Sequence, residues 1–172
     1  MNKRVKIGAQ KAVFMFISIS AFMLLFSNFL ENPVLLASFA ASLFIIFGHP
    51  KADISCPRVI IGSHLIAAVV GYSLTFVPVG DLGMSPVLVI AGTAVGVSTF
   101  LMIVLDVRHP PAAATALSFS YHLGGGLDSW MTFLVALAMI VALGVVRGIW
   151  NFLGDILEEI EDDFEERKCK KH

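Results

Sequence analysis

Charged residues are scarce in this chain and are absent from long stretches of it. Asp, Glu, Lys and Arg make up 15% of its 172 residues, whereas about 25% is usual in a soluble protein. None lies in 12–30 or in 82–105. Apolar runs of about 20 residues are long enough to cross a bilayer as helices. The scarcity argues against a soluble domain, and we expect the lipid bilayer, and no nucleic acid, as a partner.

Cysteine and familiar catalytic motifs are also missing. Cys56 and Cys169 are too few and too far apart for a disulfide scaffold or a zinc site. No paired catalytic carboxylates, HExxH or GxSxG motif occurs. We therefore expect no metal, no cofactor and no enzymatic activity.

Apolar residues, in contrast, make up 57% of the chain, and its mean hydropathy is +0.84. They form two triplets of segments, each with a long, a short and a long member: 12–30, 33–48, 58–78, 82–105, a short helix from Pro110, and 130–150. Proline heads both short helices, and Asn32 is placed to cap the first of them. The pattern predicts an all-α membrane protein of six helical segments, four long spans and two short proline-headed helices.

The distribution of Lys and Arg predicts the topology. Basic residues mark the cytoplasmic loops of membrane proteins, and they occur here in the N-terminal tail, in the loop after Gly48, around Arg108 and at the C-terminus. Six crossings place all of these on one side, so we expect a multi-pass protein of the inner (plasma) membrane with both termini cytoplasmic. If the short segments do not cross, four crossings remain and both termini still lie inside.

Three crossings in each triplet would make the second triplet run opposite to the first. This is the inverted-repeat plan of many transporters, with repeats at 12–78 and 82–150. We expect one transmembrane domain over 1–154. A charged cytoplasmic tail, with helical spacing of its apolar residues, would occupy 155–172.

Three stretches resemble the HPP family of small integral membrane proteins: ASFAASLFIIFGHP (37–50), PRVIIGSHLIAAVVG (57–71) and HPPAAATAL (109–117). Ala40 and Ala113 stand where the family usually has glycine, and Val59 replaces its usual asparagine. The resemblance implies a transporter. It also suggests a small anion as substrate, because some plant and cyanobacterial relatives are linked to nitrite transport.

A small anion needs hydrogen-bond donors, and a helix N-terminus supplies free amides with a partial positive charge. The starts of the two short helices are therefore the predicted binding site. The candidate substrate-binding residues are His109, Pro110, Pro111, Ala112, Ala113, Thr115, His64, Ser38, Ser42 and Arg58. In this hypothesis Ala112 and Ala113 offer amides, and Ser38, Ser42 and Thr115 offer hydroxyls. His109 donates to the anion or carries a proton with it.

Other interpretations of these residues stay open. His109 could cap its turn, His64 could be neutral and bonded to a carbonyl, and Arg58 could reach the membrane surface. A metal or cation transporter would use His64, His109 and Asp106, with Cys56 as a further ligand. A non-transporting scaffold or regulatory subunit would bind a partner through the acidic tail.

Small residues four apart let helices approach closely in lipid. Ser63, Ala67 and Gly71 form one such stripe, and Gly92 and Gly96 form another. We expect both to pack within the chain, with subunit contacts in a homo-oligomer as the alternative. Arg147, near the end of the last span, is expected to extend to the cytoplasmic surface.

Overall fold

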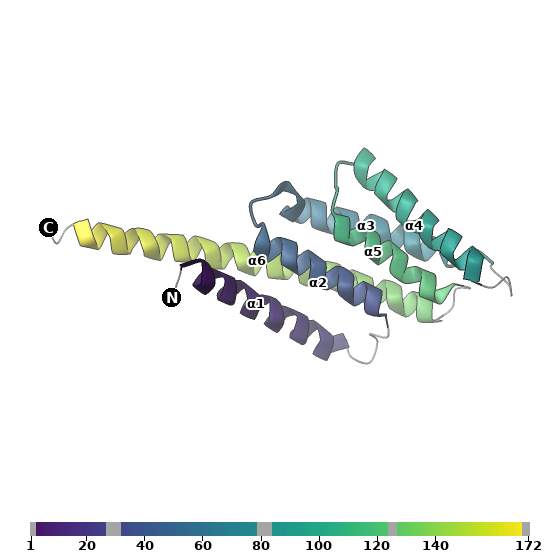
Figure 1. Ribbon diagram of the computed structural model, residues 1–172, viewed down its shortest axis with the longest axis horizontal. Coiled ribbons are helices and arrows are strands. Elements are labelled where there is room, and N and C mark those ends of the chain that lie inside the picture. Colours follow the sequence, from purple (N-terminus) through teal and green to yellow (C-terminus); the bar gives the residue numbers. More distant parts are fainter. Residues whose placement is uncertain (1–2, 27–31, 79–83, 124–126, 170–172) are drawn as a thin grey trace.

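The computed structural model describes residues 3–26, 32–78, 84–123 and 127–169. Within these ranges six α-helices lie along one axis and alternate in direction (Figure 1): α1 (Lys3–Phe26), α2 (Pro33–Gly48), α3 (Pro57–Leu74), α4 (Met84–Val104), α5 (Pro110–Ser118) and α6 (Leu127–Cys169). Two 3₁₀ turns, η1 (Asp53–Ser55) and η2 (Phe119–His122), precede α3 and follow α5. The predicted all-α class with six helical segments is confirmed.

In the described part of the chain, four helices are long and apolar enough to span a membrane: α1, α3, α4 and α6. Their outer faces are apolar, with Phe16 71%, Leu24 79% and Val89 68% exposed. His64, His109 and many hydroxyl side chains are buried instead, which is the arrangement that lipid favours. The exposed hydroxyls of Ser73 and Thr93 donate to carbonyls of their own helices. With 16 residues, α2 is about 24 Å long at ~1.5 Å per residue, shorter than a bilayer core of about 30 Å.

The pair α2 and α5 forms the polar centre of the bundle. The Asn32 side chain accepts a hydrogen bond from the Leu35 amide at 3.2 Å and so caps α2, as predicted. Its amide nitrogen also donates to the carbonyl oxygen of Ser118, at the far end of α5, at 2.7 Å. The two short helices are therefore antiparallel, and the start of α2 lies beside the end of α5 (Figure 1).

A tight turn after α4 places the residues that lead into α5. Asp106 has a φ of 52°, its amide donates to Ile103, and the Val107 amide donates to the carbonyl of Met102 at 2.9 Å. These two bonds around a left-handed residue make a Schellman turn, which commonly contains an apolar contact across it. Val107 and Met102 are buried in the same cluster, so the direction of the chain entering His109 is fixed.

Only one of the two small-residue stripes packs within the described chain. Ser63, Ala67 and Gly71 are buried on α3, and a Cβ at Gly71 would lie 2.5 Å from Phe119 Cδ2. A Cβ at Gly92 or Gly96 would have nothing within 4 Å, so the expectation that this second stripe packs internally is wrong. A subunit contact there, and a homo-oligomer, stay predictions.

Several predicted boundaries change. The first helix begins at Lys3, and its candidate membrane span begins at Gly8 rather than at residue 12. The last helix begins at Leu127 and continues to Cys169 without a break. The tail is therefore helical as far as Cys169, as the spacing of its apolar residues predicted. That residues 155–172 form a separate cytoplasmic segment stays a prediction. Residues 27–31, 79–83 and 124–126, which connect predicted segments, lie outside the described residues.

The contacts between helices have the form that an inverted repeat would produce. The middle helices α2 and α5 pack together, as do the third helices α3 and α6. In addition α1 contacts α2 and α6, while α4 contacts the equivalent helices α5 and α3. These contacts favour the repeat, which stays a prediction, and they put the short helices at the centre.

Candidate functional site

Two buried histidines meet at the centre of the bundle. His64 projects from the second turn of α3, and His109 directly precedes α5; their rings lie 5.3 Å apart between centroids. The hydroxyl of Ser42, on α2, lies between them, 2.9 Å from Nε2 of His64 and 3.0 Å from Nε2 of His109. All three residues are no more than 1% exposed. Three separate elements thus bring their polar groups to one point.

The contacts continue in both directions from this point. On one side, Nδ1 of His109 donates to the carbonyl oxygen of Ile54, just before α3, at 2.9 Å. On the other side, Nδ1 of His64 lies 2.8 Å from Oγ1 of Thr115. The Thr115 hydroxyl lies 2.8 Å from the Ser38 hydroxyl. The Ser38 hydroxyl in turn donates to the carbonyl oxygen of Pro111 at 2.7 Å. We call these five side chains, Ser38, Ser42, His64, His109 and Thr115, the polar chain.

Helix geometry explains why these residues meet. Ser38 and Ser42 are four apart on α2, and Pro111 and Thr115 are four apart on α5, so each pair shares one helix face. The faces meet because the helices are antiparallel and small residues line the contact; Ala112 and Ala116 are fully buried. The residue before a proline is restricted to extended backbone, and His109 has φ −130° and ψ 101°. Its side chain is thereby held against the loop before α3.

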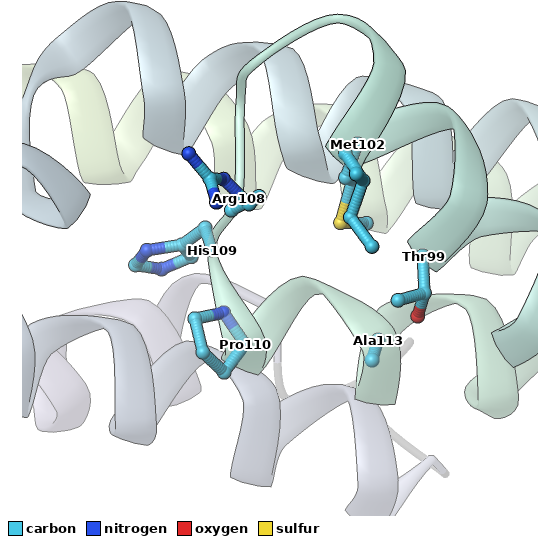
Figure 2. A pocket seen from close by; sticks show the side chains of 7 residues that line it. Thr99, Met102, Arg108, His109, Pro110 and Ala113 are labelled. Atoms are coloured by element: carbon cyan, nitrogen blue, oxygen red, sulfur yellow. The ribbon is translucent and has the colours of Figure 1, made fainter.

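A cavity of about 340 Å³ opens beside His109, between α4 and the start of α5. Figure 2 shows Thr99 and Met102 on the α4 side, Pro110 and Ala113 on α5, and Arg108 and His109 at the polar end. The guanidinium of Arg108 forms an exposed ion pair with Asp106 at 2.9 Å. Exposed pairs of this kind contribute about 0–1 kcal/mol, so Arg108 is available to another anion at little cost.

The starts of the two short helices do not form a joint anion site. Because α2 and α5 are antiparallel, their N-termini lie at opposite ends of the pair, and one small solute cannot contact both. The start of α5 is also poor in donors: Pro110 and Pro111 have no amide hydrogen, and the Ala112 amide donates to the His109 carbonyl at 3.0 Å. From Ala113 onward the amides have acceptors within the helix. The predicted cradle of helix amides is therefore wrong.

The other predicted site residues divide into those near the polar chain and those away from it. Pro110 and Ala113 line the cavity, Pro111 contributes its carbonyl, and Ala112 is buried between helices. Arg58 is exposed at the start of α3 and lies outside both the cavity lining and the polar chain. His109 makes no side-chain cap to α5, so the capping interpretation of this histidine is wrong.

Two hydrogen bonds of the interior were not predicted from the sequence. The Ile54 carbonyl accepts from His109, and a backbone acceptor leaves no signal in the sequence. Arg147 is only 8% exposed and donates to the carbonyl oxygen of Pro50 at 2.6 Å. It therefore ties α6 to the loop after α2 instead of extending to the surface, as had been expected.

The described interior contains no carboxylate. Its buried polar side chains carry hydroxyl, imidazole, amide or guanidinium groups, and Arg147 is the one permanently charged member among them. Among the described residues no group of three His, Cys, Asp or Glu side chains is close enough to hold a metal ion. These contacts do not support the hypothesis of a metal or cation transporter that uses Asp106, since Asp106 is exposed and paired with Arg108.

Comparison with known proteins places the chain in a family. A profile described as HPP, transmembrane region, matches residues 2–155. One transmembrane protein of Dictyostelium discoideum is 42% identical over 87 residues, which are 51% of this chain and 30% of that protein. Another from the same organism is 36% identical over 87 residues, 51% of this chain and 27% of that protein. The match thus spans less than a third of either relative. No solved structure matches the chain.

Proposed function

Because this chain belongs to the HPP family of transmembrane proteins, we propose that it is a transporter or channel for a small inorganic anion. The observation that carries the proposal is the absence of carboxylates from the described interior, where imidazole, hydroxyl and guanidinium groups are buried instead. Ionisable residues inside membrane proteins commonly mark the pathway of an ion. A pathway for a cation would be expected to present acidic groups, and the described interior presents none.

The cavity beside His109 is the entry that best fits such a solute. Its volume of about 340 Å³ corresponds to roughly eleven molecules of liquid water at ~30 Å³ each, so a hydrated inorganic anion fits. Arg108 lies at its polar end and can exchange Asp106 for the incoming ion. From there the next polar groups inward are His109 and Ser42.

Nitrite is the first substrate to test, since it is small, planar and monovalent. The proposal assigns the chain no enzymatic reaction. It also places both termini in the cytoplasm. The start of α1, the end of α6 and the α2–α3 and α4–α5 connections lie toward one end of the molecule (Figure 1). Lys51 and Arg108 belong to those connections and Arg58 to the first turn of α3, so basic residues gather on the side expected to be cytoplasmic. Labelling of cysteines introduced at either terminus, in intact cells and in inverted vesicles, tests this orientation.

Flux into liposomes tests the function itself. Purified protein in liposomes is supplied with nitrite, nitrate, formate or a divalent metal, and protein-free liposomes supply the background. We expect uptake of at least one anion and no uptake of the metals. Metal uptake alone would establish the cation alternative. No flux of any solute, together with a partner retained by the acidic tail, would establish the scaffold alternative.

A matched pair of variants connects the flux to the cavity. Arg108→Gln removes the cation at the polar end of the cavity, while Arg58→Gln removes an exposed arginine at the same end of the bundle that does not line it. Uptake should fall in Arg108→Gln and stay near the wild-type rate in Arg58→Gln. An equal loss in both variants would show that general surface charge, and not the cavity, attracts the anion.

A further inference from the structure

The hydrogen-bond directions in the polar chain are fixed from its two ends. Carbonyl oxygens only accept, so Nδ1 of His109 must donate to Ile54, and the Ser38 hydroxyl must donate to Pro111. With its hydrogen committed, Ser38 can only accept from Thr115. The Thr115 hydroxyl must then accept from Nδ1 of His64. Both imidazoles therefore carry hydrogen on Nδ1 and present a bare Nε2 to Ser42.

This arrangement is two hydrogens short. Seven contacts link the five side chains to each other and to the carbonyls of Ile54, Pro111 and Ser38. With both histidines neutral, each side chain supplies a single hydrogen, so five are available. The shortage falls at Ser42, which donates its one hydrogen to the carbonyl oxygen of Ser38 at 2.9 Å. Both bare ring nitrogens are therefore left facing a hydroxyl whose hydrogen is directed elsewhere.

A single added proton satisfies both rings. Placed on Nε2 of His109, it is donated to the Ser42 oxygen, and the Ser42 hydroxyl turns from the Ser38 carbonyl to donate to Nε2 of His64. The six contacts from Ile54 to Pro111 then each have one donor and one acceptor. Placed on His64 instead, the proton gives the mirror arrangement. A proton can therefore pass between the two rings: Nε2 of His109 gives its proton to the Ser42 oxygen while the Ser42 hydroxyl gives its own to Nε2 of His64.

The added proton brings a positive charge that no nearby acid balances. The acidic side chains on the surrounding elements, Asp53, Asp106 and Asp128, are all exposed. The cations Lys51, Arg58 and Arg108 are exposed, and Arg147 is buried against Pro50. His49 and Cys56 are exposed and Tyr72 and His122 half-buried. None of these groups is hydrogen-bonded to either histidine in the described chain.

A buried charge is tolerated when it is paired. An anion in the cavity would lie beside His109, which lines it, and would neutralise the proton held on the rings. We infer that the polar chain binds one proton together with each anion, so that a monovalent anion and a proton cross as an electrically neutral pair. This inference rests on the proposed function and specifies its coupling.

Simultaneous recording of anion uptake and internal pH tests the coupling. Liposomes containing the protein receive nitrite or nitrate under an imposed membrane potential, and protein-free liposomes give the leak of the neutral acid. We expect one proton to enter with each anion and the rate to be insensitive to potential. Absence of anion uptake would overturn the proposed function. Anion uptake that follows the potential and leaves internal pH unchanged would overturn only the coupling.

Ser42→Ala removes the hydroxyl that links the rings and keeps both histidines. We expect proton entry per anion to fall at least severalfold. Ser63→Ala is the matched control, because Ser63 is equally buried and donates only to the Ile60 carbonyl of its own helix; its coupling should equal that of wild type. Unchanged coupling in Ser42→Ala would refute the role of the polar chain.

A second measurement on the wild-type protein does not depend on any variant. Addition of nitrate to purified protein in weakly buffered detergent should raise the pH of the medium by the uptake of one proton per chain. Nitrogen NMR of labelled histidine should show two rings protonated at Nδ1 before the addition, and one ring protonated at both nitrogens after it. Anion binding without proton uptake or change of the ring signals would also overturn the inference.

Discussion

Replacement of Gly71 by alanine tests the close approach of α3 and α5 on which the polar chain depends. A Cβ at this position would lie 2.5 Å from Cδ2 of Phe119 and 2.9 Å from the backbone carbonyl oxygen of Ala116. The carbonyl is part of α5 and cannot rotate away as a flexible side chain would, so the helices must separate. Overpacking of this kind costs about 1–3 kcal/mol.

Gly92→Ala supplies the reference for this substitution. Both glycines lie inside helices, so alanine improves the helix propensity by up to about 1 kcal/mol in each case. A Cβ at Gly92 meets nothing within 4 Å, and the propensity gain is then the whole effect. The difference in unfolding free energy between the two variants isolates the steric cost at Gly71.

Unfolding by SDS from mixed micelles, followed by the fluorescence of Trp130 and Trp150, measures this difference. We expect Gly71→Ala to be less stable than Gly92→Ala by about 1–3 kcal/mol. Anion uptake should fall in Gly71→Ala as well, because helix separation lengthens the contact of 2.8 Å between His64 and Thr115. Coincident unfolding curves for the two variants would refute the close approach of α3 and α5.

Three further outcomes are expected. His64→Ala and His109→Ala should each lower anion uptake by about 10- to 100-fold, since a hydrogen bond to a charged group contributes about 1.5–3 kcal/mol, and should change folding less; normal uptake in liposomes would remove the histidines from the mechanism. Asp106→Gly should raise the unfolding free energy by about 1 kcal/mol, because glycine adopts the left-handed backbone without strain, whereas a decrease would mean that the ion pair dominates. Asn32→Ala should lower the unfolding free energy by about 1–3 kcal/mol through loss of the α2 cap and of the bond to Ser118, and hydrogen exchange should rise first at the start of α2.

The helices that begin at proline were predictable because their signals are local. Asn32 followed by proline places the start of α2 at Pro33, and His109 followed by two prolines places the start of α5 at Pro110, as the structure has them. His64 could likewise be expected to face inward, because an ionisable side chain is costly in lipid, and it is buried. What each side chain bonds to could not be obtained in this way.

The arrangement of the short helices depends on long-range packing and had no such signal. Opposite directions for two neighbouring helices put their N-termini far apart, and this removes the joint amide site. Arg147 shows the same limit: its position near a helix end predicted exposure, but the loop carbonyl of Pro50 folds over it. Gly92 and Gly96 have the spacing of a packing motif, yet the partner helices lie on the opposite side of α4.

The sequence His109-Pro110-Pro111 has a physical explanation in this structure. The first proline restricts the histidine to an extended backbone, which directs its ring toward Ile54 and Ser42. Two successive prolines remove two amide donors from the start of α5, and the amide of Ala112 is taken by the His109 carbonyl. The polar chain therefore meets no competing donor from the first turn of that helix. Its shortage of hydrogens persists, and one added proton, with the Ser42 hydroxyl turned from the Ser38 carbonyl, satisfies both rings.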